Sequence, residues 1–148
     1  MYKSILEIPF ETARKFPDRI SHQYMTADGE KTLTFSEFAQ YIRVLTAGLA
    51  EAGIGRKDHV GFFMNNRYEW ISTDMAIMAL GAVTVPRGSD TTPRELHFIY
   101  GHSDSTYLIL ENMNQLNDIL PVFTDDNWKE CKKIFILDHP QDDTVPDN

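Results

Sequence analysis

HVGFFMNNRYEWISTDMAIMALGAVTVP, residues 59–86, is the stretch of this sequence that decides its fold class. It begins with a short apolar run, His59–Met64, and ends with another, Ala82–Pro86. Runs of this length and composition are typical of strands that are buried on both faces. Between them, the segment Arg67–Leu80 has apolar residues at helical spacing. We therefore predict a strand, a helix and a second strand, the repeating unit of a parallel sheet.

The same alternation continues toward the C-terminus. Two more strands and two more helices are expected at Thr106–Leu110, Lys133–Leu137, Pro93–His102 and Met113–Leu120. Two of the helix starts carry capping patterns, because Asn66-x-x-Glu69 and Thr92-Pro93-x-Glu95 place a polar cap before a carboxylate at the third helical position. These elements extend the predicted parallel sheet to four strands.

Upstream of residue 59 the pattern is different. A helix is expected at Leu6–Phe16, and two extended runs at Ile20–Thr26 and Lys31–Leu33 flank Asp28-Gly29. An Asp-Gly pair between extended runs favours a β-hairpin. Thr34-x-x-Glu37 then has the spacing of a capping box, and the helix that it starts is expected to end at Gly53.

The predicted fold is therefore α/β: a β-hairpin and a capped helix, followed by βαβαβαβ with a mainly parallel sheet flanked by helices. We assign residues 1–137 to one incomplete domain and residues 138–148, which hold two prolines and four aspartates, to an acidic linker or surface loop. The second half of the helix at 67–80 is apolar nearly all round, so further polypeptide is expected to pack against it. We interpret the chain as a fragment of a larger protein.

Composition narrows the function. The 148 residues include 14 basic and 22 acidic side chains, a net charge of -8, which argues against a nucleic-acid binder. A single cysteine, Cys131, excludes an internal disulfide and favours the cytosol. The N-terminus is too acidic for a signal peptide, and no apolar run is long enough to span a bilayer. Contact with a membrane would at most be peripheral.

The best candidate for a phosphate cradle is Gly88-Ser89-Asp90-Thr91-Thr92, with Arg87 as the nearby positive charge. It lies between a strand and a helix, where backbone amides attract anions. Only one glycine is present, no lysine follows, and Asp90 would repel phosphate. We favour the structural interpretation, in which Thr92 caps the following helix.

The remaining reactive side chains form no recognisable catalytic or metal pattern. His97 and His102 are five residues apart and diverge on a helix, and no glycine-framed serine is present. We interpret the others as packing or solvated groups: His22, His59, His139, Cys131, Trp70, Trp128, Asp125-Asp126 and Asp142-Asp143. No catalytic, cofactor-binding or metal-binding residue is assigned.

Three ordered stretches resemble the N-terminal part of adenylate-forming (AMP-binding) acyl-CoA synthetases. They are Ala13–Ile20 with its Phe-Pro-Asp turn, Leu33–Phe38 leading to Gly53-Ile54, and Val60–Trp70 running on to Leu80–Pro86. The Asn-Arg-x-Glu-Trp motif and the Val-Pro pair that ends the stretch are most similar to long-chain fatty-acid–CoA ligases. The resemblance covers roughly residues 6–137. Each stretch is weak alone, and their order and spacing carry the resemblance.

The resemblance implies a parent enzyme that joins a fatty acid to ATP with Mg²⁺, giving acyl-AMP and pyrophosphate, and then to CoA. The family's phosphate loop, approximately T-S-G-T-T-G-x-P-K, has no match here, because Ser89–Pro93 lacks both glycines and the lysine. No functional residue of the family can therefore be placed on this chain. We expect the isolated chain to be inactive and the remainder of the same polypeptide to pack on it.

Two alternatives stay open. One is another acyl-AMP or aryl-AMP ligase that feeds a carrier protein, because residues outside this chain usually set the acid. The other is a free-standing α/β interaction module without catalysis.

Overall fold

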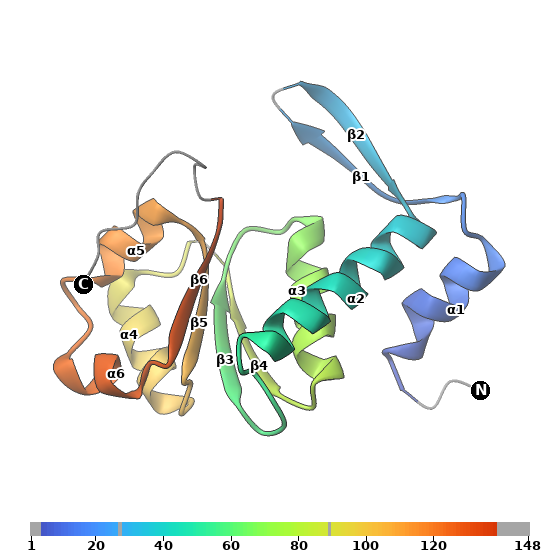
Figure 1. The fold of residues 1–148 in the computed structure, drawn as a ribbon. Coiled ribbons are helices and arrows are strands. Elements are labelled where there is room, and N and C mark those ends of the chain that lie inside the picture. The colour runs from blue at the N-terminus through green and yellow to red at the C-terminus, as the bar shows by residue number, and fades with distance from the viewer. Residues whose placement is uncertain (1–3, 27, 89, 139–148) are drawn as a thin grey trace. The chain divides into compact units, whose positions relative to one another are not determined.

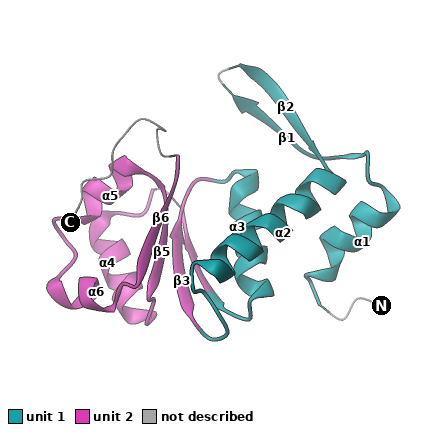
Figure 2. Ribbon diagram, viewed as in Figure 1, with its two compact units in different colours: residues 1–57, 66–83 teal, residues 58–65, 84–148 magenta. Residues whose placement is uncertain are grey.

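The computed structural model of the protein describes residues 4–26, 28–88 and 90–138. They form two compact units (Figure 2). Unit 1 comprises residues 1–57 and 66–83, and unit 2 comprises residues 58–65 and 84–148. The chain therefore changes unit at 57–58, 65–66 and 83–84. Of the predicted linker at 138–148, only Asp138 lies within the described residues.

Unit 1 contains a hairpin and helices. Its described elements are α1 (Glu7–Lys15), β1 (Ile20–Thr26), β2 (Gly29–Thr34), α2 (Phe35–Glu51) and α3 (Tyr68–Ala79) (Figure 1). β1 and β2 pair antiparallel, from Ile20 opposite Thr34 to Thr26 opposite Gly29. Gly29 has a φ of +107°, which L side chains rarely adopt, so the turn requires glycine here. The predicted hairpin and helices of this unit are confirmed.

Both ends of α2 follow the sequence signals. The Thr34 hydroxyl accepts a hydrogen bond from the Glu37 backbone at 3.2 Å, and the Glu37 carboxylate accepts one from the Thr34 backbone at 2.8 Å. At the other end Gly53 has a φ of +102°, and the Ile54 amide donates to the Leu49 carbonyl at 3.0 Å. This is the Schellman arrangement, which satisfies the last carbonyls of a helix.

The core of unit 1 lies between α2 and its neighbours. Phe38 and Ile42 of α2 and Met75 of α3 are its buried centre. Half-buried apolar side chains surround them: Leu6, Phe10, Leu33, Ile71 and Met78. The helical spacing in α2 therefore supplies one continuous face that joins α1, α3 and the hairpin.

The predicted cap of α3 is wrong. Its N-cap residue is Arg67, not Asn66, and no side chain makes a capping hydrogen bond there. Glu69, the expected partner in the capping pattern, instead accepts two hydrogen bonds from the Arg67 guanidinium. An ion pair has replaced the cap, because a neighbouring arginine offers the carboxylate two charge-assisted donors.

Unit 2 carries the sheet. Its strands are β3 (His59–Phe63), β4 (Val83–Arg87), β5 (Tyr107–Asn112) and β6 (Lys133–Asp138), in the order β4-β3-β5-β6. β5 pairs in parallel with both β3 and β6, with Val60 opposite Tyr107 and Tyr107 opposite Lys133. The α/β prediction with a parallel sheet is confirmed.

Three helices cover one side of this sheet, α4 (Pro93–His102), α5 (Met113–Ile119) and α6 (Asp125–Glu130) (Figure 1). They enclose a buried cluster of Phe63, Leu96, Tyr100, Leu108, Leu110, Ile119 and Phe123. Strand residues that alternate with these, Phe62 and Ile109, are buried as well. The strands are therefore apolar on both faces, as their unbroken runs predicted.

Helix α6 was not predicted from the sequence. Asp125-Asp126, which we interpreted as solvated groups, lie exposed in the first turn of this helix. Thr124 and Asn127 form its capping box, with the Asn127 side chain accepting from the Thr124 backbone at 2.9 Å. A six-residue helix with no buried residue has no apolar periodicity that would predict it. The capping box of Thr124 and Asn127 was the only signal in the sequence for this helix.

Candidate functional site

The carboxyl ends of the parallel strands in unit 2 are the first place to look for a site. After β3, the chain first forms β4, which lies on one side of β3 in the sheet. It later forms β5, which lies on the other side of β3. The strand order thus reverses between β3 and β5, and open α/β sheets bind ligands beyond the strand ends at such a point. Asn65 follows β3 there, and Glu111 lies near the end of β5.

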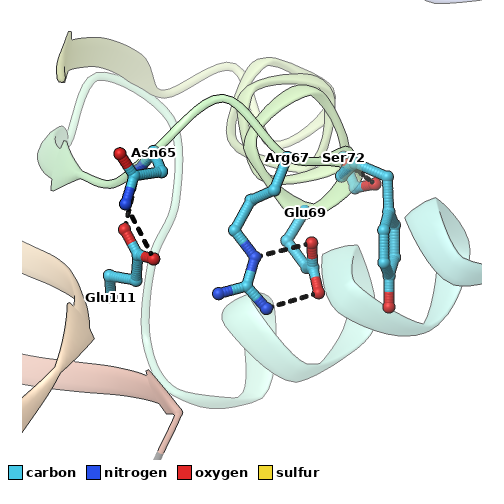
Figure 3. A network of polar contacts seen from close by, with 6 residues as sticks. Asn65, Arg67, Glu69, Ser72 and Glu111 are labelled. Carbon is cyan, nitrogen blue, oxygen red and sulfur yellow. Dashed lines mark hydrogen bonds and ion pairs between the residues drawn. The ribbon is translucent and has the colours of Figure 1, made fainter. Parts of the chain in front are cut away.

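Asn65 and Glu111 join the ends of these two strands (Figure 3). The Glu111 carboxylate accepts from the Asn65 backbone amide at 2.7 Å and from its side-chain amide at 3.2 Å. Glu111 is 8% exposed, and its own backbone amide donates to Gln115 of α5 at 2.8 Å. A buried carboxylate is tolerated only when it is hydrogen-bonded. The Asn65–Glu111 pair therefore fixes the start of the β3–α3 connection.

The predicted phosphate cradle lies after β4, and Ser89 is outside the described residues. The Asp90 carboxylate lies 2.6 Å from the position that a Cβ on Gly88 would occupy, so this negative charge is close to the Gly88 backbone. The hollow here has a volume of about 280 Å³, and its lining includes Arg87, Asp90 and Glu95. Two carboxylates against one guanidinium make it unfavourable for an anion.

The Thr92 cap explains most of this segment. The Thr92 hydroxyl and backbone amide donate to the Glu95 carboxylate at 2.7 and 2.9 Å, and these bonds hold the pKa of Glu95 below its usual range. Glu95 itself thus provides the negative charge that the start of α4 favours. The structural interpretation, a capped helix with proline at its first position, is confirmed.

Unit 1 holds the larger hollow, of about 620 Å³. Its lining comes from β1 and from the start of α3: Tyr24, Met25, Thr26, Asn66, Arg67, Tyr68 and Glu69. Arg67 donates to Glu69 through Nε at 2.9 Å and Nη2 at 2.8 Å, which neutralises both charges (Figure 3). The hollow is therefore a mixed polar and aromatic surface without a paired nucleophile and base.

Two tyrosines of this lining, Tyr24 and Tyr68, form an aromatic cluster with Tyr41 of α2. The ring of Tyr68 lies 4.8 Å from that of Tyr24 and 5.5 Å from that of Tyr41. Burial, and then the charge of Glu69, raise the pKa values of Tyr68 and Tyr41. These phenols therefore stay protonated at neutral pH, where they act as hydrogen-bonding and stacking groups rather than bases.

The other reactive side chains lie apart. His22 is in the hairpin, His59 begins β3, and His97 and His102 are in α4, where the His102 ring stacks on Phe98 at 5.3 Å. Cys131 and Trp128 pack against the unit 2 cluster, Trp70 is half-buried in α3, and His139 and Asp142-Asp143 lie outside the described residues. Across residues 4–26, 28–88 and 90–138, no group of three or more His, Cys, Asp or Glu side chains is placed to hold a metal ion.

His22 makes the stability of unit 1 depend on pH. Its ring lies 4.5 Å from that of Phe38, and burial lowers the pKa of His22. Because the unfolded chain then binds the proton more readily, we expect stability to fall as the pH drops below about 6.5. The loss is complete once the pH is below the lowered pKa of the folded state.

Urea unfolding between about pH 5 and pH 7.5 tests this dependence. His22→Phe keeps the aromatic packing and should flatten the slope of the free energy of unfolding against pH in that window. Ser21→Ala, which removes only the hydroxyl bonded to His22 at 2.8 Å, should leave the slope in place because burial is its cause. An unchanged slope in His22→Phe would show that other groups set it.

Sequence reasoning missed the Asn65–Glu111 pair. The available signal was positional, because in both β3 and β5 an apolar run ends in polar residues at the same edge of a parallel sheet. The adjacency of the two strands, which brings these ends together, is a property of the sheet order β4-β3-β5-β6. Chain order alone did not reveal it.

Comparison with known proteins gives a consistent result. The family model described as "AMP-binding enzyme" matches residues 9–146. The chain is 32% identical over 123 residues to the long-chain-fatty-acid–[acyl-carrier-protein] ligase AEE15 of Arabidopsis thaliana, covering 83% of this chain and 17% of that protein. It is 31% identical over 110 residues to the long-chain-fatty-acid–CoA ligase FadD15 of Mycobacterium tuberculosis, covering 74% of this chain and 18% of that protein.

Among solved structures, the N-terminal domain of FACL13 from Mycobacterium tuberculosis has the same fold. The TM-score is 0.77 at 21% identity, over 93% of this chain and 34% of that one. The chain thus spans about a sixth of the length of AEE15 and of FadD15.

Proposed function

Because the chain belongs to the AMP-binding enzyme family of adenylate-forming, ATP-dependent acid–thiol ligases, we propose that it is the N-terminal scaffold of a fatty-acid–CoA ligase. The observation that carries the proposal is the family match across residues 9–146. The identity of about a third to FadD15 supports a fatty acid as the substrate and CoA as the acceptor.

The proposed parent reaction has two steps. The carboxylate of the acid attacks the α-phosphorus of ATP and pyrophosphate leaves, giving acyl-AMP. The CoA thiol then attacks the acyl carbon, the thioester forms and AMP leaves. Mg²⁺ would balance the phosphate charge, but the described residues offer no cluster to hold it, so we assign it no ligand here.

We assign this chain a structural role in that reaction. Residues 1–137 would form the N-terminal portion of the AMP-binding domain, residues 138–148 an acidic linker or surface loop, and the remainder of the parent polypeptide would pack on them. No catalytic, cofactor or metal residue is proposed on the chain. No helix in the described part is long and apolar enough to cross a membrane. We propose the cytoplasm as its compartment, with membrane contact at most peripheral.

A pyrophosphate-exchange assay tests the structural role. The purified chain with ATP, Mg²⁺ and palmitate should give no exchange above that of a heat-denatured sample. A complete long-chain ligase in the same buffer serves as the positive control. Exchange by the chain alone, lost in Glu111→Ala, would mean that it holds an active site and that the scaffold assignment is wrong.

The acceptor separates two candidates. The 32% identity of this chain to AEE15 favours a carrier protein as the acceptor, whereas its similarity to FadD15 favours CoA. The complete natural polypeptide should be assayed with acids from C8 to C18 and with aryl acids, each with CoA and with a holo-carrier protein. Thioester formation with CoA and a long-chain acid supports the main proposal. Formation only on the carrier, or only with an aryl acid, supports the alternative ligases, and no activation at all supports a non-catalytic module.

A further inference from the structure

Three buried hydroxyls in the described chain, those of Thr73, Tyr100 and Thr106, have no hydrogen-bond partner. Tyr100 is the largest of these side chains, and it is only 1% exposed. Its ring lies inside the buried cluster of unit 2, 5.1 Å from that of Phe123. A buried donor without an acceptor destabilises the folded state. The Tyr100 hydroxyl therefore gains from any acceptor that is brought beside it.

The thiol of Cys131 lies beside this hydroxyl. Cys131 packs against the same cluster, and burial, followed by the Cys131 thiol, raises the pKa of Tyr100. The phenol thus stays protonated at neutral pH and remains a hydrogen-bond donor. Because a thiol is only a weak acceptor, this contact leaves the hydroxyl without a proper hydrogen bond.

The Cys131 sulfur is also accessible for reaction. Cys131 is half-buried, and it is the single cysteine of the chain, so no internal disulfide can consume it. Its sulfur lies 3.9 Å from the Lys133 carbonyl, which is at most a weak contact. Partly exposed thiols can react with small oxidants, whereas fully buried ones are inert.

We propose that Cys131 is an oxidation site for hydroperoxides, and that the Tyr100 hydroxyl donates a hydrogen bond to the sulfenic acid that forms. The thiolate attacks one oxygen of the peroxide, and the S–O bond forms as the O–O bond breaks. The sulfur loses two electrons, and the leaving hydroxide or alkoxide takes up the proton that the thiol has lost. The oxygen added to the sulfur supplies the acceptor that Tyr100 lacks, so the sulfenic acid is stabilised within the fold.

Trapping with dimedone, which reacts with sulfenic acids and not with thiols or disulfides, tests the proposal. After a brief exposure to hydrogen peroxide, peptide mapping by mass spectrometry should find a dimedone adduct at Cys131. Cys131→Ser should give no adduct. Addition of dimedone after increasing delays gives the lifetime of the sulfenic acid.

Tyr100→Phe is the diagnostic variant, because it removes the hydroxyl and keeps the ring. The lifetime of its sulfenic acid should be about tenfold shorter than in the wild type, the factor expected for one hydrogen bond of ordinary strength. Before oxidation, this variant should be at least as stable as the wild type, since it lacks the unpartnered hydroxyl. Tyr41→Phe, in unit 1, is the matched control and should leave the lifetime unchanged.

Urea unfolding of the wild-type chain gives a second measurement that needs no variant. Oxidation should move the midpoint to a higher urea concentration, and reduction with dithiothreitol should restore it. A chain that gives no adduct at Cys131, an equal lifetime in Tyr100→Phe, or a midpoint lowered by oxidation would each overturn the proposal. These measurements do not use ligase activity, so their failure would leave the proposed function untouched.

Discussion

Phe63→Ala is expected to lower the free energy of unfolding by about 3–5 kcal/mol, the usual effect of emptying a buried aromatic site. Phe63 has no exposed surface, and it lies where β3 meets the helices that cover the sheet. Its neighbours in the cluster come from β5, α4, α5 and the segment before α6, so the surrounding chain can collapse only partly into the space. The melting temperature should fall by about 10 °C or more.

Urea unfolding followed by tryptophan fluorescence gives the measurement. The Trp128 ring lies 4.9 Å from that of Phe123 in the same cluster, so it reports on unit 2. A Trp70→Phe background makes it the sole tryptophan, because the chain has two. Phe98→Ala is the matched control. Phe98 is 64% exposed, and its loss should change the free energy of unfolding by no more than about 0.5 kcal/mol. Equal losses in both variants would contradict the placement of this core.

Glu111→Ala is expected to lower the free energy of unfolding by about 1–3 kcal/mol, because it removes the acceptor for the Asn65 backbone and side-chain amides. Asn65→Ala should have a smaller effect, since the backbone bond of 2.7 Å remains. Asp118→Ala, an exposed acid in α5, should change stability by no more than about 0.5 kcal/mol.

Hydrogen exchange separates the two partners of this pair. The Asn65 backbone amide should lose protection in Glu111→Ala and keep it in Asn65→Ala. The double variant should be less destabilised than the sum of the two, as expected for residues that share a bond. Additive effects, or unchanged protection in Glu111→Ala, would mean that the Asn65–Glu111 pair does not fix this connection.

Local signals in the sequence predicted the elements whose ends are chemically marked. Asp28-Gly29 placed the hairpin turn, Thr34 and Glu37 placed the start of α2, and Gly53 placed its end. Each of these acts through hydrogen bonds or backbone conformation within a few residues. Such features are encoded where they occur, so they can be read from one segment at a time.

The errors arise where a residue has a choice of partners. Asn66 and Glu69 have the spacing of a cap, but the intervening Arg67 offers Glu69 a bidentate ion pair and the cap does not form. The Asn65–Glu111 pair depends on two strands that are adjacent in the sheet and distant in the chain. Competition among partners and strand order are tertiary properties, which a single segment does not contain.

The interleaving of the two units along the chain restricts how this protein can be synthesised and cut. Neither unit is one continuous stretch, so no single truncation or proteolytic nick releases an intact unit. On the ribosome, unit 1 lacks α3 until residues 66–83 emerge. Strand β3 cannot pair with β5 until α3, β4 and α4 have been synthesised. Pairings this distant raise the contact order and slow folding. Nascent chains shorter than about 110 residues should therefore depend on chaperones more than the completed chain does.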